Sequence, residues 1–169
     1  MAESNVEPWL RGTLTEIPAV HRGVLHALEL AEEDITRWCG TLSDSEINER
    51  PHGLPPVAFH LRHIAGSLDR LLTYAEGDQL SSEQVTALKS ELDAIATSQT
   101  VFAQFRQAIE RSADRVKKLV EVDLDQRRGV GKKQLPTTVG GLLVHVADHT
   151  QRHVGQAITT AKVLLAPRS

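Results

Sequence analysis

The stretch LLVHVADHTQRHVGQ, residues 142–156, has a histidine at every fourth position: His145, His149 and His153. At 100° per residue these positions fall within about 80° of one another, so a helix presents all three on one face. Residues eight apart lie about 12 Å apart along the axis, whereas a bond from Zn²⁺ to a histidine nitrogen is about 2.0–2.1 Å. One ion can therefore bind only two neighbours on this helix, either His145 with His149 or His149 with His153.

The apolar residues around these histidines indicate which pair faces the core. They are Leu142, Val146, Ala157 and Leu164. On a helical wheel their mean direction lies about 50° from His149, which places His153 nearest the centre of the apolar face and His145 at its rim. Two adjacent core-facing imidazoles lose solvation unless their nitrogens are bonded, and one metal ion would satisfy both. Hydrogen bonds to protein groups are the alternative explanation.

A metal site needs at least one further ligand from another helix. The stretch HLRHIAGSLDRLL, residues 60–72, offers His60 and His63. An earlier segment offers His21 and His26, which are five apart and do not bind one ion together. On the wheel His60 lies nearer the apolar face than His63 does, so periodicity favours His60. A residue at the edge of one apolar face can still contact another helix, and both remain candidates.

The remaining pattern predicts helices joined by polar segments, since apolar residues recur every three or four positions. The first two predicted helices span residues 17–38 and about 56–77. A third helical stretch begins at residue 81 and has a break at 96–98. The last helix runs from Thr137 or Thr138 to about residue 165. Thr97 or Ser98 would cap the second part of the broken helix. Segment 122–136 lacks this period and is predicted to be an exposed, partly extended loop. These elements predict an all-α protein, a four-helix bundle, in a single domain spanning residues 1–169.

Composition restricts the compartment and the partners. Lys plus Arg number 19 against 22 Asp plus Glu, a net charge of -3, so no overall positive field favours nucleic acid. The single cysteine, Cys39, cannot form an intramolecular disulfide, and the first residues lack the basic start and apolar run of a signal peptide. No uncharged apolar run approaches the roughly 20 residues that span a bilayer. We expect a soluble cytoplasmic protein with no nucleic-acid or membrane partner.

With HLRHIAGSLDRLL in the second helix and HVADHTQRHVGQ in the last, the chain resembles the DinB/YfiT-like superfamily of helical bundles. In that family one histidine of the second helix joins an H-x-x-x-H pair of the last helix around a divalent metal. The resemblance implies that the ligands are His63, matched by its HIAGS context, with His149 and His153. Many members have H-R-G-Q after the second paired histidine, whereas this chain has HVGQ, with Val154 in place of Arg.

The ligand set that the resemblance implies has an open fourth position, which is typical of catalytic rather than structural metal sites. From the ligand type we expect Zn²⁺, with Ni²⁺ as the next candidate. HTQRH has the spacing of H-E-x-x-H, but Thr150 stands where that motif has its general-base Glu, which excludes a zincin-type peptidase. Gln156, one turn after His153, is the candidate catalytic residue, since it could orient a bound water or substrate.

The resemblance also implies a function. Characterised relatives include thiol S-transferases and an isomerase that use low-molecular-weight thiols. We therefore expect a metal-dependent enzyme, either a thiol-dependent S-transferase or a hydrolase, that uses a metal-bound thiolate or water on a small-molecule substrate and forms a homodimer. The rival expectation is a non-catalytic metal-binding or dimeric stress-response bundle protein, whose histidines are satisfied by protein groups.

Overall fold

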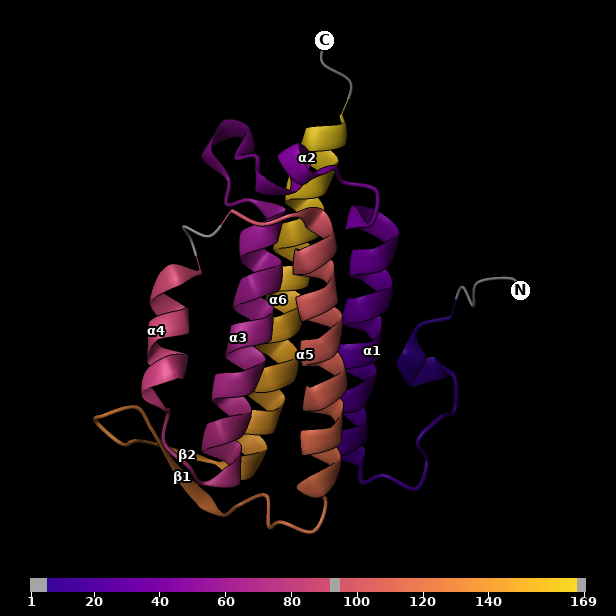
Figure 1. Cartoon of the computed structure of the whole chain (residues 1–169). Helices are drawn as coiled ribbons and strands as arrows, with labels where there is room; N and C mark the ends of the chain where they lie inside the picture. The colour runs from indigo at the N-terminus through magenta and orange to yellow at the C-terminus, as the bar shows by residue number, and fades with distance from the viewer. Residues whose placement is uncertain (1–5, 92–94, 167–169) are drawn as a thin grey trace.

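Four long helices dominate the computed structural model, which describes residues 6–91 and 95–166. They are α1 (Ala19–Cys39), α3 (Val57–Glu76), α5 (Ser98–Lys118) and α6 (Val139–Leu165). The four lie side by side as a bundle (Figure 1), in which α1 and α3 each pack against both α5 and α6. The all-α four-helix bundle predicted from the sequence is confirmed.

Shorter elements lie at the ends and on the outside of the bundle (Figure 1). They are the 3₁₀ turns η1 (Pro8–Leu10) and η2 (Pro51–Gly53), the helices α2 (Asp44–Asn48) and α4 (Ser82–Ser90), and the strands β1 (Arg127–Val130) and β2 (Leu135–Thr138). Helix α4 lies outside the bundle next to α3, and the β1–β2 hairpin lies at the end where α6 begins.

Local signals set the bounds of α3 and α6. Pro56 directly precedes α3, and Gly77 ends that helix with φ of 100°, a left-handed conformation that suits glycine. The Thr138 hydroxyl accepts a hydrogen bond from the Gly141 amide at 3.1 Å, so Thr138 rather than Thr137 caps α6. The predicted bounds of both helices are therefore confirmed.

The predicted break in the third helical stretch is also present. Helix α4 begins at the predicted position, with a capping box formed by Ser81 and Gln84. A new helix, α5, begins after Thr97, whose hydroxyl accepts from the Thr100 amide at 3.2 Å. The two parts pack differently, since α5 belongs to the bundle and none of the residues Ser82–Ser90 is buried.

The sequence pattern left two local features undetected. Segment 122–136, expected to be a partly extended loop, forms most of an antiparallel hairpin in which Arg127 pairs with Thr138. A hydrogen bond links this hairpin to α3: Nε of Arg128 donates to the Ala75 carbonyl at 2.8 Å. The short α2 was not predicted, although Ser43 and Glu46 form a complete capping box.

The core lies between the four long helices. Its largest fully buried side chains include Leu28, Ile35, Leu61, Ile64, Leu68, Leu72, Phe105 and Leu143. Burial of each such side chain contributes roughly 1.5–3 kcal/mol, and this apolar packing holds α3 and α6 side by side. Within the described residues, no helix is both long and apolar enough to cross a membrane.

Candidate metal centre

Three histidines from two helices meet at the contact between α3 and α6. One ring nitrogen each from His63 on α3 and from His149 and His153 on α6 lie within 4.8 Å of one another. The ring centroid of His63 is 5.1 Å from that of His149 and 4.4 Å from that of His153, and the two α6 rings are 4.6 Å apart. The structure thus brings together the three residues that the family resemblance selected as ligands.

The third histidine of the α6 stripe lies outside this cluster. The side chain of His145 is 46% exposed, and its Nδ1 is 3.5 Å from a carboxylate oxygen of Asp148. Asp148 also accepts from Arg152 at 2.8 Å, so it is a solvated, paired residue that does not point to the cluster. The placement of His145 at the rim agrees with the helical wheel.

His60, the alternative ligand on α3, contacts the cluster from its buried side. Its residue exposure is 3%, and its Nδ1 lies 3.2 Å from Nδ1 of His153. One of these two nitrogens donates and the other accepts, and when Nδ1 of His153 is the donor, its Nε2 has the lone pair that a metal would bind. His60 therefore holds His153 in place, and His63 is the α3 residue whose ring nitrogen joins the cluster.

The environment keeps the rings of His149 and His153 uncharged. Burial lowers the pKa of His149 to about 4, and nearby His153 and His63 act in the same direction. Burial, followed by the neighbouring His63 and Arg152, also lowers the pKa of His153. A ring nitrogen binds a metal only when it carries no proton, so these lowered values favour metal binding at neutral pH.

His21, His26 and His52 lie apart from this cluster. Nε2 of His21 lies 3.1 Å from the carbonyl oxygen of Leu119, and Nε2 of His26 lies 3.2 Å from the hydroxyl of Thr13. His52, in the Pro-rich segment before α3, is exposed. None of the three belongs to the cluster of ligand-type residues at the α3–α6 contact.

A carboxylate that the sequence did not indicate supports the cluster. Oε2 of Glu91, at the C-terminal end of α4, lies 2.6 Å from Nδ1 of His63, and Oε1 accepts from Arg70 at 2.7 Å. Burial would raise the pKa of Glu91, but hydrogen bonds from His63 and Arg70 outweigh it and lower the pKa. The residue is therefore a buried carboxylate, 7% exposed, bonded to a cluster histidine.

Comparison with known proteins agrees with this architecture. A family model described as the DinB superfamily matches residues 27–157, most of the bundle. The chain belongs to the DinB superfamily. A solved structure, that of a conserved protein of a locus from Enterococcus faecalis, is 18% identical with a TM-score of 0.69. The match covers 84% of this chain and 95% of that one, and it shows the same fold. No curated protein matches the sequence.

In this DinB-superfamily chain the histidine cluster lies between two cavities. The larger, about 690 Å³, is lined by His60 and His153 together with Leu54, Pro55, Phe59, Arg152, Gly155, Gln156, Thr159 and Thr160. The smaller, about 240 Å³, is lined by His145 and His149 together with Ser67, Arg70, Leu71, Tyr74, Leu80 and Leu88. The larger cavity therefore reaches the ring of His153 and the smaller one the ring of His149, and Gln156 lines the larger cavity.

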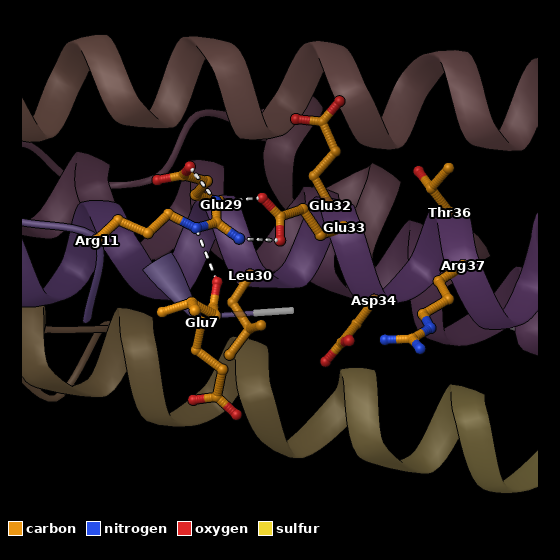
Figure 2. Close-up of a pocket in the computed structure, with 10 residues that line it drawn as sticks. Glu7, Arg11, Glu29, Leu30, Glu32, Glu33, Asp34, Thr36 and Arg37 are labelled. Atoms are coloured by element: carbon orange, nitrogen blue, oxygen red, sulfur yellow. Dashed lines mark hydrogen bonds and ion pairs between the residues drawn. The ribbon is translucent and has the colours of Figure 1, made fainter. Parts of the chain in front are cut away.

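A further cavity of about 690 Å³ lies on the outer face of α1 (Figure 2). Two of its acidic side chains face Arg11, whose Nη1 donates to Glu29 at 2.8 Å and to Glu33 at 2.6 Å. None of the described residues that line it is a histidine, and its Arg11 is already paired with Glu29 and Glu33. We therefore place the candidate chemistry of this DinB-superfamily protein at the α3–α6 cluster.

Proposed function

We propose that this protein is a metal-dependent enzyme for a small-molecule substrate, in which His63, His149 and His153 hold a divalent ion. The observation that supports the proposal is the convergence of their ring nitrogens between two cavities. Imidazole nitrogen is a preferred ligand of first-row divalent ions, so we propose Zn²⁺ first and Ni²⁺ second. A cavity of about 690 Å³ is in the size range of small-molecule sites.

When bound, such an ion would lower the pKa of a water or thiol at its open position. The residues of the larger cavity would bind and orient the substrate. The amide of Gln156 offers one donor and one acceptor group beside His153. Leu54, Pro55 and Phe59 form an apolar wall that would hold an apolar part of the substrate and exclude water.

Of the two reactions, thiol transfer fits the cavity better than hydrolysis. None of the described residues that line the two cavities beside the cluster is Asp or Glu, so neither cavity offers a carboxylate as general base for water. Thr150, at the position of the zincin Glu, is buried. A thiol bound to the divalent ion would lose its proton without such a base.

The thiol would be a low-molecular-weight cofactor rather than a group of the chain. Cys39, the single cysteine, is fully buried. Burial raises the pKa of its thiol to about 12, so it stays protonated at neutral pH. We therefore propose a thiol-dependent S-transferase, with a hydrolase as the alternative reaction at the same site.

The metal content of untagged protein, purified without chelators, tests the site. We expect stoichiometric divalent metal in the unmodified protein and its loss in His149→Ala, His153→Ala and His63→Ala. His145→Ala is the matched control, because it removes an exposed histidine of the same helix that lies outside the cluster. Full metal content in the double variant His149→Ala/His153→Ala would refute the assignment.

Activity is tested separately from metal binding. Unmodified protein would be screened with low-molecular-weight thiols and electrophilic acceptors, as isolated, after metal removal, and after Zn²⁺ is restored. The proposal expects turnover that disappears with the metal and returns with it. Binding of metal without turnover on any acceptor would favour the non-catalytic alternative.

One contact favours that alternative, a non-catalytic bundle protein. The 3.2 Å contact between Nδ1 of His60 and Nδ1 of His153 shows that a cluster ring is already bonded to a protein group. If the histidines of such a protein bind no metal, its melting temperature would not change on addition of Zn²⁺. For either function we propose a homodimer, which light scattering of the purified protein would test.

A further inference from the structure

We infer that Glu91 is a positioning residue of the metal site: its carboxylate fixes the ring of His63 so that Nε2 is the nitrogen presented to the ion. This inference rests on the proposed metal site and extends it to a residue on a different helix. Oε2 of Glu91 lies 2.6 Å from Nδ1 of His63. An ionised carboxylate can only accept, so Nδ1 carries the proton and donates. In the neutral ring the lone pair is then on Nε2, which lies 3.5 Å from the Ser67 hydroxyl.

The carboxylate is itself held from several directions. Its other oxygen, Oε1, accepts from Nη1 of Arg70 at 2.7 Å, so both oxygens are occupied. Nη2 of Arg70 donates to the Ser67 hydroxyl at 3.2 Å. The main-chain carbonyl of Glu91 accepts from Nε of Arg62 at 3.2 Å. Glu91 therefore cannot turn away from His63 without leaving the buried guanidinium of Arg70 without its carboxylate partner.

Helix α3 leaves space for this carboxylate at Gly66. A Cβ atom at Gly66 would overlap the Glu91 carboxylate and lie 2.6 Å from Nη1 of Arg70. Gly66 is in the interior of α3, where glycine is one of the poorest helix formers. Its neighbours at helical spacing on the same face are His63 and Arg70. The missing side chain at Gly66 therefore allows Glu91 to reach His63.

Packing of α4 does not account for the burial of Glu91. None of the residues Ser82–Ser90 is buried, although Glu91, directly after them, is only 7% exposed. The rest of α4 reaches α3 through Gln84, whose Nε2 donates to Asp69 at 2.6 Å and to Thr73 at 3.0 Å on the surface. A carboxylate is costly to bury, and its bond to His63 gives that burial a function.

Replacing Glu91 by Gln should reverse the direction of the hydrogen bond at Nδ1 of His63, so that this nitrogen accepts instead of donating. Arg70 can only donate, so it will take the amide oxygen of the new side chain and leave the NH₂ group facing Nδ1. Nδ1 must then accept, and the proton of the neutral ring moves to Nε2, the nitrogen inferred to bind the ion. The substitution should therefore block the ligand atom without removing any ligand.

Binding of Zn²⁺ alone, by competition titration, tests the inference. We expect Glu91→Gln to weaken Zn²⁺ affinity about 10- to 100-fold, as for loss of a carboxylate behind a ligand histidine. The matched control is Glu76→Gln, which breaks an interhelical pair with Arg115 far from the cluster and should leave the affinity unchanged. Gly66→Ala should weaken the affinity as well, whereas Gly23→Ala should not, because a Cβ at Gly23 meets nothing within 4 Å.

A spectroscopic measurement separates positioning from mere support of the fold. ¹⁵N correlation spectra of the metal-free proteins report the tautomer of each neutral histidine ring. We expect His63 to be the Nδ1–H tautomer in the unmodified protein and the Nε2–H tautomer in Glu91→Gln. An Nε2–H tautomer in the unmodified protein, or equal Zn²⁺ affinity in Glu91→Gln, would overturn the inference while the metal site stands. No Zn²⁺ binding by the unmodified protein would overturn the proposed function. If Glu91→Gln does not fold, the Zn²⁺ affinities of Gly66→Ala and Gly23→Ala test the inference instead, and equal affinities would overturn it.

Discussion

Acid should destabilise the metal-free protein through His60. Burial, with His153 and His63 nearby, lowers the pKa of this ring from 6.5 to about 4, and the residue is 3% exposed. In the unfolded chain the pKa returns to its usual value of about 6.5. Between these two values the unfolded chain binds a proton that the folded protein does not. The free energy of unfolding therefore falls as the pH falls from 6.5 toward 4.

The size of this effect follows from the difference in pKa. A difference of about 2.5 units corresponds to roughly 3.4 kcal/mol, at about 1.4 kcal/mol per unit. Between pH 7 and pH 5 about 2 kcal/mol of stability is lost, because the ring becomes protonated in the unfolded chain and stays neutral in the folded protein. The lowered pKa values of His149 and His153 act in the same direction.

Urea unfolding of chelator-treated protein at pH 7 and pH 5 measures this loss of unfolding free energy. His60→Gln cannot take up a proton, so its loss between the two pH values should be smaller than that of the unmodified protein by about 2 kcal/mol. This smaller pH dependence is expected even if His60→Gln is less stable than the unmodified protein at both pH values. His52→Gln, which changes an exposed histidine, should keep the full pH dependence. An equal pH dependence in His60→Gln and the unmodified protein would refute the reasoning.

Four further outcomes are expected. Phe105→Ala empties a fully buried position on α5 and should lower the free energy of unfolding by about 3–5 kcal/mol in a denaturant titration. Thr138→Ala removes the cap of α6 and should cost about 1 kcal/mol, seen as a lower melting temperature. Gln156→Ala should retain stoichiometric metal but reduce kcat/KM, and loss of metal would contradict its assignment to the substrate. Zn²⁺ at about 100 times its Kd should raise the free energy of unfolding by about 2.7 kcal/mol, and no change would favour the non-catalytic bundle.

The helices of the bundle were predictable because their signals are local. Apolar periodicity, the cap at Thr138, the capping box at Ser81 and the stop at Gly77 each act within a few residues. The β1–β2 hairpin was less visible, because its positive φ angles fall on Gly131 and on Gln134, which is not a usual turn residue. The helix α2 was overlooked although its capping box is present in the sequence.

The choice between His60 and His63 shows the limit of periodicity. The wheel placed His60 nearer the apolar face, and His60 is indeed the more buried, at 3% exposure against 20% for the His63 side chain. Burial alone does not select a ligand, because the cluster lies at the edge of the core, where cavities reach it. The neighbouring residues of His63, compared with the family, selected the histidine that joins the cluster.

By itself the sequence determined which residues share a helix and a face, because the 3.6-residue repeat is a property of the backbone. It therefore predicted His149 and His153 as a pair and His145 as a rim residue. Helical spacing left open which α3 histidine meets this pair, and the tertiary structure decided that it is His63 and that Glu91 bonds to His63. Those contacts depend on how helices distant in the chain cross, and on a space left by Gly66, which no spacing within one helix can reveal.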